Sequence, residues 1–357
     1  MDKSVQTVVM YLITHMGLIF FLYPADIIDS VYQGQWYPIL LGFAFHLTVV
    51  IVFMKGMSLF GELDLVDSLR TAGNWAAILL LLPVAIYLLL ACVITVRAYS
   101  DIVTIVFLSN TPLWAIMALV LTISSFMATL GIEAMFRTAI LLFIIFIPLA
   151  LFVIIASFQN ADWMYMLPHL DRDTLSTAFV LKRPFLKSLF AFGGAYLFLG
   201  FVQPYFTFKR RYVVFSSLVL LPFFLISVYV PILTFGQDTV QLFHFPYIMT
   251  IDTISIDWLM FDRISLFFLL SMITFAILFV AMVMWKAVRI IRFTSTVSPK
   301  IVIPIAGASI FAVCLQVPDW SHVDALLWWN TIFRLYVLIL IPAATLFLGI
   351  RYKRKGA

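Results

Sequence analysis

Charged residues are scarce in this chain, and their scarcity excludes an ordinary water-soluble fold. Asp, Glu, Lys and Arg make up 11% of the 357 residues, whereas hydrophobic residues make up 64%. The mean hydropathy is +1.12. A soluble domain carries roughly 25% charged residues. We therefore expect lipid, rather than water, to cover the surface of this protein, as in an integral membrane protein.

Cysteine is also rare, since Cys92 and Cys314 are the only two and both lie in long apolar runs. They support no disulfide scaffold, no CxxC pair and no haem attachment motif. The sequence lacks a Walker phosphate loop, HExxH, GxSxG and clustered metal ligands. His169, His244 and His322 are isolated in separate predicted outer loops. We therefore expect no enzyme, no metal site and no cofactor.

Ten apolar stretches are long enough to cross a bilayer, which takes about 20 residues for a helix. The first is interpreted as a retained span, because Tyr23-Pro24-Ala25-Asp26 is no small-residue cleavage site. Residues 98–110 either continue the third span or form a short surface helix. We predict an all-α integral membrane protein with one polytopic domain over residues 1–357. The predicted spans are residues 7–23, 36–54, 74–96, 112–130, 138–157, 185–206, 212–236, 263–288, 300–317 and 328–350.

The basic residues predict that both chain ends lie in the cytoplasm. With this orientation 15 of the 22 Lys and Arg residues fall inside, Lys286 among them, and the other seven, including Arg334, fall outside. The outer connections 24–35, 237–258 and 318–327 hold no Lys or Arg. The net charge of +5 therefore reflects membrane topology, and we do not expect nucleic acid as a partner.

Ten spans divide into five plus five, and an odd number of spans reverses the orientation of the second half. Residues 1–157 and 185–350 would then form an inverted repeat, linked by the outer loop 158–184. The halves show no clear internal identity, so this division rests on the span count alone. In such transporters the first helix of each half is often broken near the middle of the membrane, where freed backbone groups bind substrate.

Glycines mark the places where those breaks are expected. The stretches are Thr14-His15-Met16-Gly17 in span 1 and Phe192-Gly193-Gly194-Ala195 in span 6. Glycine within a helix lowers helix propensity and lets a ligand approach the backbone closely. Close packing between helices explains the same small residues without any ligand.

Few polar side chains lie inside the predicted spans. His15 and His46 are the only ionisable groups that we place well inside the apolar core, where such groups indicate function by default. Neutral histidines that bond between helices are the alternative. Tyr87, Ser271 and Thr274 either line a cavity or bond to neighbouring helices. No Asp or Glu falls deep in any span, so a carboxylate proton relay is unsupported.

Glu133 and Arg137 are four residues apart between spans 4 and 5. Residues at this spacing share one face of a helix and can form an ion pair. We interpret the pair as a structural bridge at the membrane interface rather than as a catalytic acid and base.

Scattered short motifs give the chain a resemblance to a known family. The motifs are spread over nearly the whole chain. Their order and spacing resemble the spore germination permease family, the GerAB-type B subunits of germinant receptors in endospore-forming bacteria. The motifs are Arg97, Asn110-Thr111-Pro112, Gly131-Ile132-Glu133-Ala134-Met135-Phe136-Arg137, Leu167-Pro168, Phe261-Asp262-Arg263 and Val317-Pro318-Asp319.

The resemblance implies the fold of the amino acid–polyamine–organocation (APC) transporter superfamily, which is LeuT-like. This fold has five-plus-five inverted repeats and a pocket between spans 1, 3, 6 and 8. The resemblance also implies that the protein senses a small germinant, usually an amino acid, together with germinant receptor A and C subunits. The expected location is the spore inner membrane or the cell membrane.

The resemblance implies that Tyr87 and Ala91 face the pocket, by their spacing from Arg97 in span 3. It implies the same for Gly193, Gly194 and Tyr196, by their distance from Pro204 in span 6. The chain departs from the family pattern twice, because span 1 lacks a Gly-rich break and Tyr196-Leu197-Phe198 stands where many members have a Glu. Residue types and resemblance together predict a ligand site. Its members are His15, Gly17, Tyr87, Ala91, Gly193, Gly194, Tyr196, Ser271 and Thr274.

Three functions fit this combination. The first is a receptor subunit, whose ligand shifts the equilibrium of a membrane complex without net transport. The second is an amino-acid permease or exchanger that works alone, and the third is a structural or ion-conducting subunit. We favour the receptor, because missing core carboxylates count against proton coupling. The expected ligand is a small zwitterionic or amide-bearing molecule.

Overall fold

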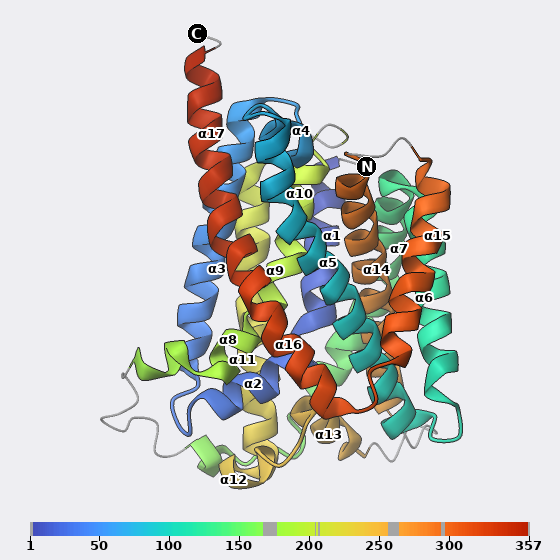
Figure 1. Ribbon diagram of the computed structural model, residues 1–357. Helices are drawn as coiled ribbons and strands as arrows, with labels where there is room; N and C mark the ends of the chain where they lie inside the picture. Colours follow the sequence, from blue (N-terminus) through green and yellow to red (C-terminus); the bar gives the residue numbers. More distant parts are fainter. Residues whose placement is uncertain are drawn as a thin grey trace.

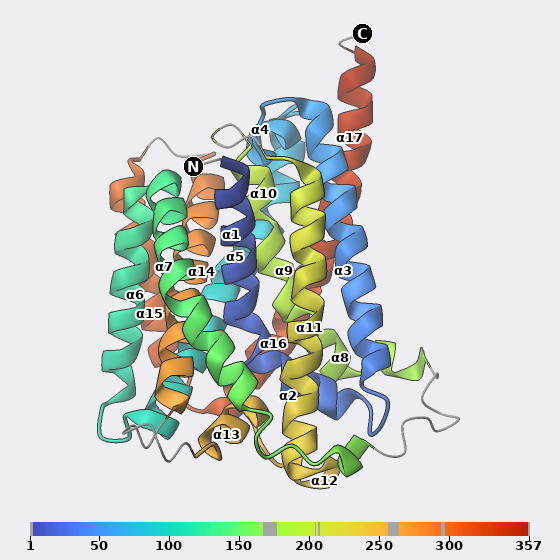
Figure 2. The ribbon, with the colours of Figure 1, turned by 180° about the vertical axis from the view of Figure 1, so that it is seen from behind.

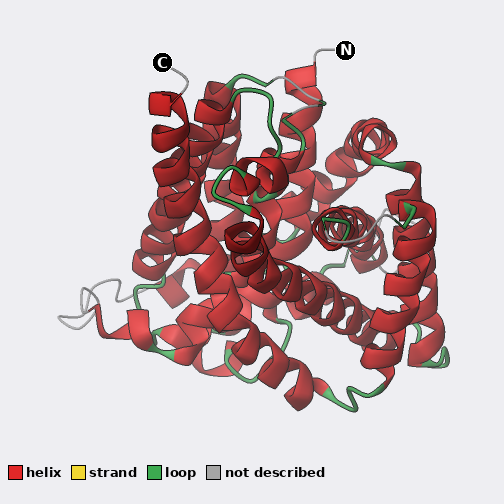
Figure 3. Ribbon diagram, turned by 45° about the horizontal axis from the view of Figure 1, so that its top comes forward, coloured by secondary structure: helices red, strands yellow, loops and turns green. Residues whose placement is uncertain are grey.

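The computed structural model describes residues 3–166, 177–203, 205, 208–255, 264–293 and 297–355. Helices joined by short connections make up this part of the chain, and it contains no strand (Figure 3). The predicted all-α membrane fold is thereby confirmed. The helices are α1 (Lys3–Ile19), α2 (Leu22–Ser30), α3 (Trp36–Met57), α4 (Leu65–Arg70), α5 (Asn74–Ile102), α6 (Leu113–Leu130), α7 (Ile132–Ala156), α8 (Arg183–Ser188), α9 (Phe190–Tyr196), α10 (Phe198–Phe201), α11 (Arg210–Phe235), α12 (Gln237–Val240), α13 (Pro246–Asp252), α14 (Ser265–Ile291), α15 (Pro299–Leu315), α16 (Trp320–Leu335) and α17 (Ile341–Lys355).

Eight helical stretches of the described chain are long and apolar enough to cross a membrane, and the bent pair of α1 and α2 raises the number to nine. The apolar helix α15 has 17 residues and is shorter. Each of the ten predicted spans coincides with helix, although the count of ten itself stays a prediction. Helix α5 runs on into the π-helical turn η2 (Val103–Phe107), so residues after 98 extend the third span.

The first span bends at a different place from the one predicted. Helices α1 and α2 meet at 58°, with Phe20 and Phe21 between them. Pro24 explains the bend, because proline has no N–H for the Phe20 carbonyl and its ring clashes with that carbonyl. The stretch Thr14–Gly17 lies inside α1, so the break predicted there is wrong. The predicted outer connection 24–35 is helical as far as Ser30.

The two interrupted spans lie side by side. The stretch Arg183–Phe201 is interrupted by the single residues Leu189 and Leu197, which separate α8, α9 and α10. Helix α2 packs along α8, and α1 packs along α9 (Figures 1 and 2). The long helices α5 and α14 pack along each other beside them. These elements form the centre of the molecule, and the remaining long helices surround them.

Both ends of the described chain lie at one end of the molecule, which is the top in Figure 1. Helix α12 lies at the opposite end. Termini on a common side agree with an even number of spans. The assignment of that side to the cytoplasm rests on the basic residues and stays a prediction.

Reporter fusions test this orientation. Fusions at Arg211, near the start of α11, and at Arg292, after α14, should read as cytoplasmic, whereas a fusion at Asp238 in α12 should read as external. The reason is that basic residues are retained on the cytoplasmic side during insertion. Paired alkaline phosphatase and green fluorescent protein fusions at each position make the measurement. An external signal at Arg211 would overturn the ten-span topology.

Candidate functional site

Helix α9 carries the predicted glycine pair through the buried centre of the protein. Every residue of α9 is buried. A Cβ atom on Gly193 would overlap Oη of Tyr87 and would lie 3.1 Å from Cγ of Arg334. On Gly194 it would lie 3.0 Å from Cζ of Phe279. Glycine is therefore needed at both positions, because side chains from three other helices approach the backbone of α9 closely.

Two buried cations bind backbone carbonyls at the interruptions of this span. Lys286 of α14 is 1% exposed, and its Nζ donates to the carbonyl of Gly194 at 2.7 Å. Arg334 of α16 is fully buried, and its Nη1 donates to the carbonyls of Leu186 and Lys187 at 2.9 and 2.8 Å. Carbonyls at a helix C-terminus are left without helical partners and carry partial negative charge. The two cations therefore stabilise the interruptions on either side of α9.

These cations correct the prediction that His15 and His46 are the only ionisable groups well inside the core. The charge count placed Lys286 on the cytoplasmic side and Arg334 outside, yet both are buried between helices. Lys286 lies more than one turn before the end of α14 and is flanked by apolar residues, which is a signal that the count overlooked. Arg97 of α5 is also buried, at 2% exposed.

The two predicted histidines lie together beside α9. The ring centroids of His15 (α1) and His46 (α3) are 5.2 Å apart, and the His46 ring stacks on Phe192 at 4.8 Å. His15 Nδ1 faces the carbonyl of Tyr11 at 2.8 Å and must donate to it. Oη of Tyr11 lies 2.7 Å from Nε2 of His46 and 2.7 Å from Oγ of Ser217. Each histidine thus forms a hydrogen bond through one ring nitrogen, and its other ring nitrogen has no partner in the described chain.

Unsatisfied polar atoms gather around α9. Within the described residues, four buried atoms of neighbouring side chains have no hydrogen-bond partner: His15 Nε2, His46 Nδ1, Tyr87 Oη and Arg334 Nε. Leaving such an atom unpaired costs about 1–3 kcal/mol, so each one calls for an explanation. Four of them around one glycine-containing helix make this region the candidate ligand site. We call these four side chains, Lys286 and the α9 backbone the core site.

A charged cluster lies where α2, α8 and α16 meet. Nζ of Lys187 (α8) lies 3.1 Å from Oδ1 of Asp26 (α2) and 2.5 Å from Oδ1 of Asp324 (α16). Asp26 is buried and its Oδ2 has no partner in the described chain. Asp26 lies outside the predicted first span, residues 7–23, and the structure buries it on α2 beyond the bend at Phe20. One lysine holds together the three helices that border the core site.

Four further predicted site residues are Ala91, Tyr196, Ser271 and Thr274, and the three with hydroxyl groups bond to backbone carbonyls. Ala91 is buried on α5 one turn after Tyr87, and Oη of Tyr196 donates to the carbonyl of Val337 at 2.7 Å. Ser271 and Thr274 donate to carbonyls of their own helix, at 2.8 and 2.6 Å. The structure therefore brings His15, Tyr87, Gly193 and Gly194 together and leaves the two α14 hydroxyls apart.

Gly17 serves helix packing in this conformation. A Cβ there would lie 3.1 Å from the backbone carbon of Phe275 in α14. The Gly17 carbonyl also accepts a hydrogen bond from Oη of Tyr99 in α5. Both contacts fit the packing alternative for the small residue in span 1.

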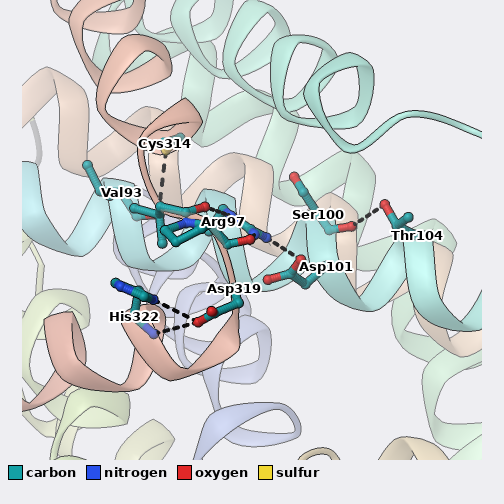
Figure 4. Close-up of polar contacts among 10 residues, drawn as sticks. Val93, Arg97, Ser100, Asp101, Thr104, Cys314, Asp319 and His322 are labelled. Carbon is teal, nitrogen blue, oxygen red and sulfur yellow. Dashed lines mark hydrogen bonds and ion pairs between the residues drawn. The ribbon is translucent and has the colours of Figure 1, made fainter.

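Two of the motifs that carry the family resemblance meet in space (Figure 4). Nε of Arg97 donates to the carbonyl of Val317 at 3.1 Å, and its Nη2 donates to the carbonyl of Pro318 at 3.2 Å. Arg97 also pairs with Asp101 one turn later. The motif after span 9 is thereby tied to the end of span 3.

Asp319 caps the start of α16 beside this cluster. Its carboxylate accepts from the backbone N–H of His322 at 3.1 Å (Figure 4). It also accepts from Oγ of Ser321 at 2.7 Å. Hydrogen bonds from Ser321 and His322 lower the pKa of the Asp319 carboxyl below its ordinary value, because they favour its charged form. The arrangement is a structural helix cap.

Glu133 and Arg137 form the predicted ion pair at 3.5 Å on the exposed first turns of α7. At this distance and exposure the pair is worth little for stability, which fits a modest interfacial bridge. The motifs Leu167-Pro168 and Phe261-Asp262-Arg263, together with Pro204, lie outside the described residues.

Comparison with known families agrees with this architecture. A family model described as spore germination protein, the spore permease model, matches residues 3–321. The matched region includes α1 to α15 and every core-site element except Arg334. No curated protein matches the chain. Because the family model covers nearly the whole helical core, this integral membrane protein belongs to the spore germination permease family.

Proposed function

We propose that this chain is the membrane subunit of a spore germinant receptor, which binds a small germinant at the core site and triggers germination. The observation that carries the proposal is the ring of unpartnered polar atoms around α9. Arg334 and Lys286 offer positive charge to a carboxylate, and guanidinium groups suit carboxylates especially well. The free nitrogen of neutral His15 or His46 can accept a hydrogen bond from an ammonium group. An amino acid carries both groups.

The same elements support the inverted-repeat architecture over residues 1–157 and 185–350. The first span of each half is interrupted, as α1–α2 and as α8–α10. The two interrupted spans pack against each other. Of the third spans of the two halves, α14 packs along α1, and α5 packs along α14. This is the arrangement in which transporter-like folds form a binding site at the repeat interface.

A germinant acts in this proposal by shifting a conformational equilibrium. Its carboxylate competes with backbone carbonyls for Lys286 and Arg334, and so loosens the contacts that join α9 to α14 and α8 to α16. A difference of about 2–3 kcal/mol in binding energy between two states shifts their populations roughly 30- to 150-fold. We propose that A and C subunits in the spore inner membrane or cell membrane read out the shift, with both termini of this chain in the cytoplasm.

The alternative function is an amino-acid permease, and one observation favours it. Lys286 and Asp26 are buried ionisable groups within the helical core, and sequence reasoning had placed neither there. Intramembrane ionisable groups often mark ion or proton pathways. Asp26 is, however, held by Lys187, so it is not free to pair with a substrate in this conformation.

Uptake into vesicles separates the two functions. Vesicles that contain this chain alone should bind radiolabelled amino acids without accumulating them, whether or not a pH gradient is present. The physical reason is that a sensor needs only differential affinity between two states. Empty vesicles and vesicles with the Gly193→Leu variant serve as controls. Gradient-driven accumulation well above both controls would replace the receptor with the permease.

A further inference from the structure

A cavity away from the core site lies at the end of the molecule opposite the chain termini. It has a volume of about 210 Å³. The connection between α2 and α3, the short helix η3 (Trp163–Met166) and the junction of α11 with α12 enclose it. It shares no lining residue with the core site, so whatever binds there binds independently of α9.

The hydrogen-bond pattern leaves two donors in this cavity. Nε2 of Gln35 donates to the carbonyl of Tyr32 at 3.0 Å and to Oε1 of Gln237 at 2.9 Å. Because a carbonyl can only accept, Gln35 must present its NH₂ group here, and Gln237 must turn its oxygen toward it. Nε2 of Gln237 is then buried without a partner in the described chain. Oη of Tyr229 accepts from the backbone N–H of Trp36 at 2.9 Å, so its own hydrogen can be donated to a ligand.

The walls of the cavity are aromatic and uncharged. The rings of Tyr32, Trp36, Tyr165 and Tyr229 line it, and no Asp, Glu, Lys, Arg or His is among its described lining residues. The neighbouring carboxylate of Asp238 is bound by Oη of Tyr32 at 2.6 Å. Burial of an unpaired ion is costly, so this cavity does not suit a charged ligand. It suits a small neutral ring with an apolar face and oxygen acceptors at its edge.

We propose that this cavity binds a neutral sugar ring. The C–H face of a pyranose lies against the aromatic walls, and two of its oxygens accept from Nε2 of Gln237 and Oη of Tyr229. An adjoining apolar groove of about 480 Å³ shares Trp36, Met166 and Tyr229 with the cavity. The sugar can therefore arrive as a free hexose or as the head group of a glycolipid whose chain lies in the groove. This site is additional to the amino-acid site around α9.

Gln237→Glu is the sharpest test. The carboxylate still accepts from Nε2 of Gln35, but both donor hydrogens are lost. The melting temperature of the variant shows what the added charge costs the fold. Gln159→Glu is the matched control, because Gln159 bonds the Ser255 carbonyl at the same end of the molecule and does not line the cavity. The full chain is purified in a detergent without a sugar head group. Equilibrium dialysis then measures binding of radiolabelled glucose, galactose and mannose, and binding of glucosyl diacylglycerol in nanodiscs.

Wild type and Gln159→Glu should bind the sugar probes saturably. Gln237→Glu should bind them at least about tenfold more weakly, because an oxygen of the sugar loses its hydrogen-bond donor. Binding of a free hexose identifies a soluble ligand, whereas binding of the glycolipid alone identifies a membrane ligand. Equal binding by wild type and Gln237→Glu, or no saturable binding of either probe, would overturn the proposal. Melting temperatures confirm that each variant is folded. The amino-acid response of Gln237→Glu should stay at the wild-type level, which separates this site from the core site.

Discussion

Spores that carry Gly193→Leu should fail to germinate in a mixture of the standard amino acids. Any side chain at this position meets Oη of Tyr87 and Cγ of Arg334, so a leucine must displace these two side chains, which belong to the proposed germinant site. The loss is expected to be complete at germinant concentrations that trigger wild-type spores fully. The measurement is the fall in optical density of the spore suspension, with immunoblots of spore membranes to quantify the protein.

Compensation by Tyr87 distinguishes a ligand site from simple packing damage. Gly193→Ala adds one methyl group that overlaps the Tyr87 hydroxyl, and Tyr87→Phe removes that oxygen while keeping the ring. The double variant should therefore recover part of the protein level and melting temperature that Gly193→Ala loses, but not the germinant response if Tyr87 Oη binds the ligand. Disappearance of the protein in every Gly193 variant, including the double one, would instead assign the glycine to helix packing.

Lys286→Met should raise the amino-acid concentration needed for germination by about 100-fold or more. A buried charge pair that loses one partner costs about 3–5 kcal/mol, which is the expected loss if Lys286 holds the carboxylate of the germinant. Folding should change much less. The unpaired Gly194 carbonyl costs about 1–3 kcal/mol, and this cost is offset because a cation no longer has to be buried. Germination dose–response curves and melting temperatures in detergent measure the two effects separately.

Lys300→Met is the matched control for this variant, because Lys300 is exposed at the start of α15. It should leave both the dose–response curve and the melting temperature unchanged. A normal dose–response curve for Lys286→Met would remove Lys286 from the ligand site. A large fall in melting temperature with a normal response would leave it a purely structural role at the interruption after α9.

Local features of the sequence predicted the elements of this protein well. Apolar runs placed all ten predicted spans on helices, because the length of a membrane helix is set by the bilayer and is visible within one stretch of sequence. The pairing of Glu133 with Arg137 followed from helical spacing alone. The glycine pair in span 6 was also found locally. The bend of the first span was misplaced, although Pro24 lies four residues after Phe20 and was a usable signal.

Contacts between distant segments decided the rest. Lys286 bonds a carbonyl 92 residues away and Arg334 bonds carbonyls 147 and 148 residues away, so a count of charges near span ends assigned both to the wrong environment. The cavity between Gln35 and Gln237 likewise joins segments 202 residues apart. By itself the sequence determined that this protein is a bundle of membrane helices with an interruptible sixth span, because hydrophobicity and backbone freedom are local properties. Only the tertiary structure decided which polar groups are buried and left without partners, because that depends on which helices pack together.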